Sequence, residues 1–474
     1  MTALWIADAM RDAMRARAEG AMPQAITGIS IDSRTIQPGE AFFALTDARD
    51  GHEFVDAALK AGAGLAVVAK DKRTQLPKDA ALLVVDDVLD GLRDLATASR
   101  ARTTSKIIGV TGSVGKTSTK EALRLALAPE GETFASAASY NNHWGVPLSL
   151  SRCPADARYA VFEMGMNHAG EIEPLSKLVR PHIAIVTTVE PVHLEHFKNV
   201  AAIADAKAEI FAGLEPGGAA ILNRDNDQFA RLKKHTDHMK VGRVVSFGEH
   251  KSADVRLINF ALQEKGSTVQ AKVLGTEVAY KLGAPGRHLI MNSLAVLAAA
   301  ALAGADLALA ALALAELQPA PGRGTRGKLR LPEGTALLID ESYNANPASM
   351  RAALALLGQI HRGSRGRRIA VLGDMLELGN ASDAMHRDLR EAVVANNVDL
   401  VFCSGPAMHN LWEALPSERR GGYAEDAKSL EPMVIEAVRD GDVLMVKGSN
   451  GSRMGPLVKA LQRTYAAATA PVQG

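Results

Sequence analysis

Cysteine is nearly absent from this chain. Cys153 and Cys403 are the two cysteines in 474 residues, and they lie far apart without forming a CxxC pair. A disulfide framework needs several paired cysteines and an oxidising compartment, so the sequence excludes a disulfide-stabilised secreted domain. A reducing compartment fits this cysteine usage, and we expect the cytoplasm.

An excess of charge of either sign is also missing. Lysine and arginine number 54 against 53 aspartates and glutamates, which leaves a formal net charge of +1. Proteins that bind nucleic acid neutralise phosphates with a basic excess, and no such excess exists here. We therefore expect no nucleic-acid partner.

Long apolar segments without charge are the third absence. Charges at Asp8 and Arg11 come before any secretory apolar core develops. The stretch Ser293–Leu317 is almost all alanine and leucine, but Asp306 and Glu316 interrupt it. Because alanine is only weakly apolar, packed helices explain this stretch better than a membrane span. We expect a soluble chain without membrane insertion.

The pattern of apolar runs divides the chain into three regions. With 474 residues, 47% hydrophobic and 23% charged, the chain is long enough for two to four globular domains. Residues 1–105 contain short strand-like runs separated by turn residues, and residues 106–320 alternate strands with helical patterns. The turn-rich Pro319–Gly322 stretch is typical of a linker, and the same alternation resumes over 321–474. The candidate strands are Ala41–Leu45, Leu65–Ala69, Ala81–Val85, Ile107–Val110, Tyr159–Met164, His182–Val189, Ala219–Asn223, Leu337–Asp340, Arg368–Leu372, Leu400–Cys403 and Val443–Val446.

This alternation predicts an α/β protein of three domains. We expect a small N-terminal α/β domain over 1–105 and a central P-loop-type domain over 106–320, in which helices cover both faces of a parallel sheet. The region 321–474 predicts a Rossmann-like, doubly wound domain. Candidate helices in it are Met350–Ile360 and His386–Asn397.

A phosphate-binding loop begins the central domain. The strand Ile107–Val110 runs into the loop Thr111-Gly112-Ser113-Val114-Gly115-Lys116-Thr117-Ser118, and helical sequence follows over Thr119–Leu127. Backbone N–H groups at the start of such a helix face an anion, the lysine neutralises terminal phosphates, and the threonine can ligate Mg²⁺. The strict GxxxxGK[ST] spacing fails because valine stands at position 110. The loop predicts nucleotide binding and leaves hydrolysis, ligation and switching open.

Candidate metal ligands follow downstream. Glu163 ends the apolar run Tyr159–Phe162, where open α/β sheets place ligand-binding residues. Its carboxylate and the Thr117 hydroxyl suit Mg²⁺, although a solvated carboxylate at a strand end is the alternative. His193 and His196 superficially suggest zinc, but they are one short pair without an HExxH helix or a third ligand.

Several other residues suit a nucleotide. Gly322–Gly327 matches GxGxxG, but it follows Pro-Ala-Pro rather than a strand, so a dinucleotide site is not expected there. Asp340 ends an apolar run and can hydrogen-bond a ribose. His288 and Asn292 are isolated polar residues near a helix start, where they can equally serve as caps.

Taken in order, these motifs resemble the Mur ligase family. The loop TGSxGKT lacks the first glycine of the general motif, as in the ATP loop of that family, and further matches extend over nearly the whole chain. They are Ser139–Asn142 with Gly145–Pro147, Glu163–Gly165, Asn167-His168, Gly170–Ile172, Thr188, His193, Ala206–Phe211, Asn292-Ser293, Gly322-Arg323, Asp340–Pro347 and Leu372–Met375. Tyr343–Pro347 and Gly373–Gly379 resemble the D-alanyl-D-alanine-adding branch, and the DNPR signature of the diaminopimelate-adding branch is missing. The sequence departs from the family pattern at His143-Trp144 and at Glu341, which stands for a second aspartate.

The resemblance implies a cytoplasmic, ATP-dependent carboxylate–amine ligase of peptidoglycan synthesis, and hence of cell shape and division. Such a ligase joins D-alanyl-D-alanine to a UDP-N-acetylmuramoyl-tripeptide through an acyl phosphate, and it uses ATP and Mg²⁺. We expect the protein to act as a monomer.

The resemblance also implies roles for individual residues. Catalysis is expected of Lys116, His193, Lys207 and Arg323. ATP contacts are expected from Thr111, Gly112, Ser113, Val114, Gly115, Lys116, Thr117 and Ser118, from His288 and Asn292 at the adenine, from Arg323 at the phosphates and from Asp340 at the ribose. Mg²⁺ is expected at Thr117, Glu163, His193 and Lys207, with Lys207 carbamylated. Contacts to the UDP part of the substrate are expected at Ser30, Asp32, Ser33 and Arg34. Contacts to the carboxylate region of the substrate are expected at Asn141 and Asn142. The alternative for Lys207 is an ordinary helix lysine paired with Asp205 or Glu209.

The residues leave other functions open. On the same scaffold these are a diaminopimelate- or lysine-adding Mur ligase and a folylpolyglutamate synthetase, against which the Asn141-Asn142 pair and Tyr343–Pro347 argue. A P-loop switch or transport ATPase would release phosphate without an acceptor amine. A nucleotide-binding module without catalysis is disfavoured by the additional metal-ligand candidates.

Overall fold

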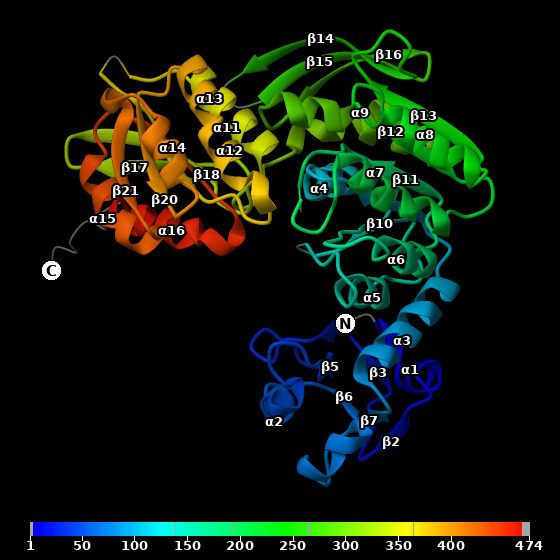
Figure 1. Ribbon diagram of the computed structural model, residues 1–474. Coiled ribbons are helices and arrows are strands. Elements are labelled where there is room, and N and C mark those ends of the chain that lie inside the picture. Colours follow the sequence, from blue (N-terminus) through cyan, green and yellow to red (C-terminus); the bar gives the residue numbers. More distant parts are fainter. Residues whose placement is uncertain (1–2, 138, 193, 264–265, 364, 467–474) are drawn as a thin grey trace, which may run out of the picture.

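Three large β-sheets follow one another along the chain, and helices cover each of them (Figure 1). The short strands β1 (Trp5–Ile6) and β3 (Ala25–Ile26) form a separate antiparallel pair in the N-terminal region. The computed structural model describes residues 3–137, 139–192, 194–263, 266–363 and 365–466. The expected α/β class with three successive domains is confirmed by these sheets.

The N-terminal domain is built on a five-stranded sheet with a helix layer on each face. The strand order is β2 (Arg17–Glu19), β7 (Leu82–Val85), β6 (Leu65–Ala69), β5 (Ala41–Phe43) and β4 (Ile29–Ser30). Alternate side chains of a strand point to opposite faces. One set packs under α1 (Ala7–Ala13) and α3 (Val88–Arg102), and the other packs under α2 (Val55–Lys60).

The central sheet has nine strands, and its first six are parallel. They are β9 (Thr133–Ala135), β10 (Tyr159–Glu163), β8 (Lys106–Thr111), β11 (Ile183–Val186), β12 (Ala219–Asn223) and β13 (Arg243–Gly248), in that spatial order. The expected parallel sheet is confirmed, and antiparallel strands extend its far edge. There β14 (Val255–Gln263) pairs parallel with β13, but β15 (Gly266–Val273) and β16 (Thr276–Leu282) continue it as antiparallel strands. Antiparallel neighbours that follow closely along the chain need no crossover helix.

Helices cover both faces of the central sheet. One layer contains α4 (Lys116–Leu127), α9 (Arg287–Leu302) and α10 (Leu307–Ala313); the other contains α5 (Gly145–Ser151), α6 (Ile172–Val179), α7 (Val200–Ala208) and α8 (Phe229–His238). The alanine-rich stretch thus forms α9 and α10, whose small side chains pack against the sheet. Among the described residues, no helix has both the length and the apolar character to cross a membrane.

The C-terminal domain is doubly wound, with an antiparallel strand at one edge. Its strand order is β17 (Thr325–Leu331), β18 (Gly334–Glu341), β22 (Val443–Lys447), β19 (Arg368–Gly373), β20 (Leu400–Ser404) and β21 (Arg420–Ala424). One face is covered by α11 (Pro347–Gln359), α12 (Ser382–Arg387), α13 (Leu389–Ala395) and α14 (His409–Ala414), and the other by α15 (Ala427–Ala437) and α16 (Met454–Thr464). The single helix expected over His386–Asn397 is two helices, because the chain turns at Asp388.

The N-terminal and central domains share a hydrophobic core through α5. Leu148 of α5 is fully buried among N-terminal side chains. The last carbonyls of a helix lack partners within it. Here the Trp5 indole N–H donates to the Ser151 carbonyl at 2.8 Å, and the Ser99 hydroxyl donates to the Leu150 carbonyl at 2.6 Å. These contacts fix the N-terminal domain against the central one.

Candidate active site

The phosphate loop lies at the carboxyl end of β8 and depends on two glycines. Gly112 has a φ of +150°, and a Cβ there would lie 1.9 Å from the Thr187 hydroxyl, which donates to the Val114 carbonyl at 2.6 Å. Gly115 has a φ of +87°, and a Cβ there would lie 2.6 Å from the amide nitrogen of Asn292. Glycine alone satisfies both the dihedral angle and the close approach. The loop therefore leads directly into the N-terminus of α4, the geometry that binds phosphates.

Lys116 is the first residue of α4, and its ammonium donates to the Gly112 carbonyl at 2.8 Å. Burial lowers the pKa of Lys116; the nearby Glu163 carboxylate opposes that shift, and the Arg323 guanidinium adds to it. Two cations in a poorly hydrated site favour an anion as the missing partner. The predicted role at the phosphates fits this position.

The predicted metal ligands Thr117 and Glu163 are in contact. The Thr117 hydroxyl donates to one Glu163 oxygen at 2.9 Å, and the Asn141 amide donates to the other at 2.7 Å. Glu163 is 1% exposed. Neither donor carries a charge, and a buried carboxylate needs a cation to balance it. A hard cation with oxygen ligands, such as Mg²⁺, fits this donor set.

A cavity of about 330 Å³ opens beside these groups. It is lined by Ser113, Val114, Gly115, Lys116, Thr117 and Ser118 of the loop, by Ser139, Asn141, Glu163 and Gly165–Asn167, and by residues of the C-terminal domain. The C-terminal residues are Gly322, Arg323, Glu341, Tyr343, Asn344, Asn346, Ser349 and Lys447. Of the predicted loop residues, Thr111 and Gly112 are buried and do not line it.

Side chains of the C-terminal domain hold one another at the cavity wall. The Arg323 guanidinium lies 4.0 Å from the centre of the Tyr343 ring. Lys447, which is 3% exposed, donates to the Glu341 carboxylate at 3.2 Å and to the Asn344 carbonyl at 3.0 Å. Arg323 was predicted here, and Glu341, Tyr343 and Asn344 lie in motifs marked in the sequence without an assigned role. Lys447 was missed, because no local motif marks a lysine at the end of β22.

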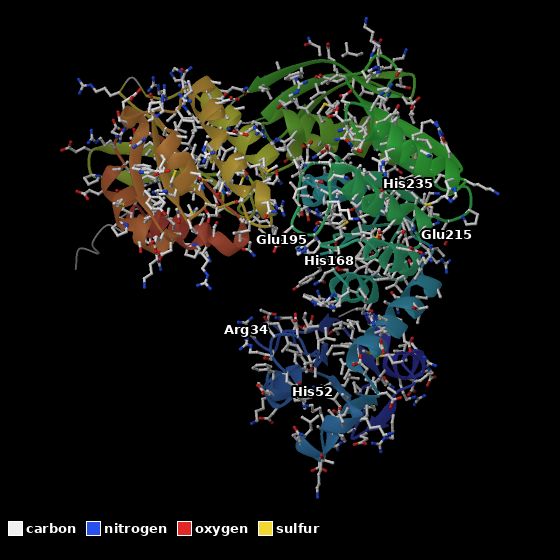
Figure 2. The ribbon with its side chains drawn as sticks, viewed as in Figure 1. Arg34, His52, His168, Glu195, Glu215 and His235 are labelled. Carbon is white, nitrogen blue, oxygen red and sulfur yellow. The ribbon has the colours of Figure 1, made fainter. Side chains whose placement is uncertain are left out.

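Lys207 lies buried in α7, 2% exposed, and neither expected acidic partner pairs with it. Asp205 binds Arg231 through two hydrogen bonds of 2.6 and 2.7 Å and also contacts His235 at 2.7 Å; Figure 2 labels His235. Glu209 accepts three backbone N–H groups around the start of α6, at 2.7–3.2 Å. Burial lowers the pKa of Lys207 well below its usual range; the charge of Lys116 adds to this, and Glu209 opposes it.

A second cavity of about 260 Å³ continues from the first. His288, Val114, Gly115, Glu341 and Ser349 line both, and Asn292 lines the second. Asp340, expected at the ribose, lines neither. Its carboxylate accepts from the Ser342 backbone at 3.0 Å and hydroxyl at 2.6 Å. Because successive residues of a strand point to opposite faces, the neighbouring Glu341 lines both cavities in its place, and a ribose contact at this strand end stays a prediction.

The predicted substrate loop lies on the N-terminal domain, away from both cavities. Its Ser30 hydroxyl donates to the Asp32 carbonyl at 3.2 Å, and Arg34 donates to the Asp32 carboxylate at 2.9 and 2.7 Å. This pairing lowers the pKa of Asp32 to about 2. Arg34 is exposed, as Figure 2 shows, and Ser33 is half-buried. The loop is preformed, and its assignment to the UDP part stays a prediction.

Asn142 and His193 are two further residues predicted for the site. Asn142 is exposed, and its side-chain oxygen accepts the Gly145 N–H at 2.8 Å in front of α5, so its described contact is a helix-start contact. His193, predicted as a metal ligand, lies outside the described residues.

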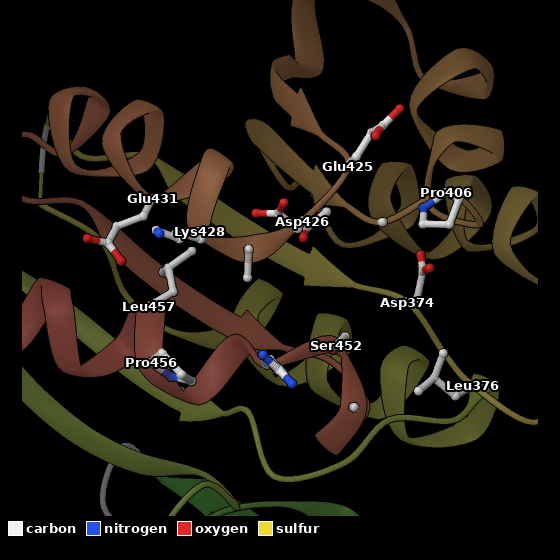
Figure 3. Close-up of a pocket in the computed structure, with 15 residues that line it drawn as sticks. Asp374, Leu376, Pro406, Glu425, Asp426, Lys428, Glu431, Ser452, Pro456 and Leu457 are labelled. Carbon is white, nitrogen blue, oxygen red and sulfur yellow. The ribbon is translucent and has the colours of Figure 1, made fainter.

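A third cavity, of about 720 Å³, lies within the C-terminal domain (Figure 3). It is bounded by the loops after β19, β20 and β21 and by the start of α16. Asp374 at its wall accepts the Met408 N–H at 2.8 Å, while Lys428 and Arg453 bring positive charge. Lys447 at the end of β22 lines the phosphate cavity, and Gly451 lines the third cavity. The two cavities are therefore only a few residues apart along the chain.

Comparison with known families agrees with this site. The family model described as Mur ligase middle domain matches residues 110–300. The one described as Mur ligase, glutamate ligase domain matches 329–450, and the one described as Mur ligase family, catalytic domain matches 25–100.

Individual relatives match over nearly the full length. The chain is 34% identical to the UDP-N-acetylmuramoyl-tripeptide–D-alanyl-D-alanine ligase of Escherichia coli, covering 92% of this chain and 94% of that one. It is similar to the crystal structure of MurF from Acinetobacter baumannii, with a TM-score of 0.81, 30% identity and coverage of 97% and 99%. The MurF ligase of Thermotoga maritima in complex with ADP matches with a TM-score of 0.74, 26% identity and coverage of 92% and 97%. With the phosphate loop, the buried carboxylate and the cationic wall in one cavity, these matches show that the chain belongs to the Mur ligase family.

Proposed function

We propose that this protein joins D-alanyl-D-alanine to a UDP-N-acetylmuramoyl-tripeptide with consumption of ATP. One observation carries the proposal: Thr117 and Asn141 both donate hydrogen bonds to Glu163. Lys116 and Arg323 line the same cavity as this group. The full-length relatives named for this reaction support the choice of substrates.

The reaction needs an activated carboxylate, since a carboxylate is a poor electrophile. A tripeptide carboxylate oxygen attacks the γ-phosphorus of ATP, ADP leaves, and an acyl phosphate forms. The amine of D-alanyl-D-alanine then attacks the acyl carbon, phosphate leaves with the bonding electrons, and the amine loses a proton. Lys116 and Arg323 are placed to balance the charge of the transferred phosphoryl group.

Mg²⁺ would be held at Thr117 and Glu163, where it would screen the phosphate charge. Asn141 keeps the Glu163 carboxylate in place by binding its other oxygen. This arrangement uses the pair predicted from the sequence and adds a positioning role for Asn141.

Lys207 would act as a carbamate. Carbon dioxide adds to an uncharged amine, and the burial of Lys207, with Lys116 as a nearby positive charge, favours that form. The alternative, a lysine paired with Asp205 or Glu209, loses its support because both carboxylates are already engaged elsewhere. The adduct would present oxygens to a cation next to the phosphate site, in place of a positive charge that repels it.

The acceptor dipeptide would bind in the 720 Å³ cavity. Its carboxylate suits Lys428 and Arg453, and its ammonium suits Glu425 and Asp374. Open α/β sheets bind ligands at the carboxyl ends of their strands, which is where this cavity lies. We also propose that the enzyme acts as a monomer in the cytoplasm.

Phosphate release tests the proposal. The protein is incubated with ATP, Mg²⁺ and the UDP-muramoyl tripeptide, with and without D-alanyl-D-alanine, and free phosphate is measured. We expect continuous release in the presence of the dipeptide and at most a small amount in its absence. Equal release in both would favour an ATPase, and release with diaminopimelate or lysine in place of the dipeptide would identify another Mur ligase.

A further inference from the structure

The cavity next to the phosphate loop has two ends of different character. The end shared with the phosphate cavity carries Gly115, His288 and Glu341 and lies where the sugar of a nucleotide would follow the phosphates. The far end is walled by apolar side chains, namely Met291, Ala348, Ala352, Ala353 and Leu356. A purine ring fits such walls, and its polar edge must then meet the few polar groups there.

Among the described residues that line this cavity but not the phosphate cavity, Glu190 is the only one with a carboxylate. It is half-buried, and its backbone is tied to the phosphate loop: its N–H donates to the Ser113 hydroxyl at 2.9 Å, and that hydroxyl donates to its carbonyl at 3.1 Å. The Glu190 main chain therefore keeps a fixed position relative to the phosphate loop.

The Glu190 carboxylate is held by one neutral donor. The Asn226 amide donates to the Thr188 hydroxyl at 3.0 Å, which leaves the Thr188 proton to donate to one Glu190 oxygen at 3.2 Å. The other Glu190 oxygen receives no hydrogen bond from the described residues, and no ion pair to it is found among them. Burial raises the pKa of Glu190. The charge of Arg351 lies near enough to oppose this shift, but no described residue donates a hydrogen bond to the second oxygen, which leaves it available to a ligand donor.

The other polar groups nearby are already in use. The Asn223 amide donates to the Thr187 carbonyl at 3.2 Å, and its oxygen accepts the Asp225 N–H at 3.0 Å. The Asn292 amide lies 3.4 Å from the Ser118 hydroxyl, toward the phosphate loop. Among the side chains that line this cavity and not the phosphate cavity, Glu190 is the one carboxylate, and one of its oxygens has no hydrogen bond from the described residues.

We propose that Glu190 accepts a hydrogen bond from the exocyclic amine of the adenine base and thereby selects adenine nucleotides. The inference rests on the proposed function for the identity of the nucleotide. It adds a specificity-determining residue to the ATP site that no sequence motif marked.

The test removes the two partners of this hydrogen bond separately. Binding of ADP and of purine riboside 5′-diphosphate, which lacks the exocyclic amine, is measured by titration calorimetry with Mg²⁺ for the parent protein and for Glu190→Ala. A hydrogen bond to a charged group corresponds to about a tenfold difference in Kd, so we expect the parent protein to prefer ADP by about tenfold. In Glu190→Ala the two ligands should bind equally.

Asp227→Ala is the matched control, because Asp227 is a nearby carboxylate that lies outside this cavity. It should keep the preference for ADP, and Glu190→Gln, which retains an acceptor oxygen, should keep part of it. If circular dichroism shows that Glu190→Ala does not fold, Glu190→Gln is compared with the parent protein instead. An unchanged tenfold preference for ADP in Glu190→Gln would contradict a hydrogen bond to a charged carboxylate.

Two results would overturn the inference. One is an undiminished preference for ADP in Glu190→Ala. The other is loss of discrimination between ADP and 3′-deoxy-ADP in that variant, which would assign Glu190 to the ribose. Because binding requires no ligation, a protein that shows the predicted preference but joins no dipeptide would refute the proposed function and leave the role of Glu190 intact.

Discussion

Lys116 and Lys207 are two lysines for which we propose different roles. Lys116 lies at an anion-binding helix start and needs its charge, whereas Lys207 is buried beside it and has lost its expected partners. Burial lowers the pKa of both, and the proposed chemistry differs because Lys116 lines the phosphate cavity and Lys207 does not.

Replacing Lys116 removes the charge that balances the transferred phosphoryl group. Lys116→Ala should lower kcat by at least about a hundredfold, since a lost contact to developing charge costs several kcal/mol. Circular dichroism should show a folded protein. Lys106→Ala, at the opposite end of β8, is the control and should keep near-normal turnover. Near-normal turnover in Lys116→Ala would remove the ATP-site assignment.

Lys207 gives a prediction that separates a carbamate from a cation. Lys207→Ala should be nearly inactive, and short-chain carboxylic acids in the buffer should restore part of the rate by occupying the carbamate position. Lys207→Arg keeps a positive charge and should stay inactive. An active arginine variant, together with no rescue of the alanine variant by acids, would eliminate the carbamate.

At the scale of elements, Glu209 shows how one side chain fixes a helix start. Its carboxylate accepts three backbone N–H groups at and before the first turn of α6. The start of a helix carries unpaired donors and a partial positive charge, which a carboxylate satisfies. Glu209 therefore joins α6 to the segment that carries Lys207.

Glu209→Ala should lower the free energy of unfolding by about 1–3 kcal/mol, since several charge-assisted hydrogen bonds are lost. Glu173→Ala is the control, because the exposed Glu173 pairs with Lys177 on the helix surface. That pair contributes about 0.5 kcal/mol or less. Urea unfolding of both variants measures the difference, and equal effects would contradict the capping role.

At the scale of the whole molecule, the shared core makes the N-terminal and central domains one mechanical unit. Leu148 lies in that core, and Trp5 and Ser99 bind the end of the same helix from the N-terminal side. The UDP-binding loop predicted at Ser30–Arg34 is thereby held at a fixed separation from the phosphate loop.

Leu148→Ala should weaken both domains together. A buried leucine-to-alanine change costs about 2–5 kcal/mol. Hydrogen exchange should therefore speed up in α1 and α3 as well as in α5. Leu123→Ala, which lies in the core between α4 and the central sheet, should leave exchange in α1 unchanged at the same loss of stability. Exchange that rises in α5 alone would contradict a shared core.

The local parts of this fold followed from the sequence. The runs Leu65–Ala69 and Ala219–Asn223 are strands with the predicted bounds, because a short buried apolar run needs no distant information to become a strand. The edge formed by β14–β16 was missed, since its alternation of exposed and buried residues is weaker and its pairing depends on two turns.

The sequence by itself determined the phosphate loop, the helix start that carries Thr117, the strand end that carries Glu163 and the order of the domains. Backbone dihedrals of glycine and the strand–turn–helix order act over a few residues, so they can be read locally. Tertiary structure alone decided which groups meet: Glu341 rather than Asp340 at the cavity, Glu209 at the start of α6, and Glu190 in the wall of the second cavity. These contacts join residues tens to hundreds of positions apart, and they depend on sheet order and on the face to which each side chain points.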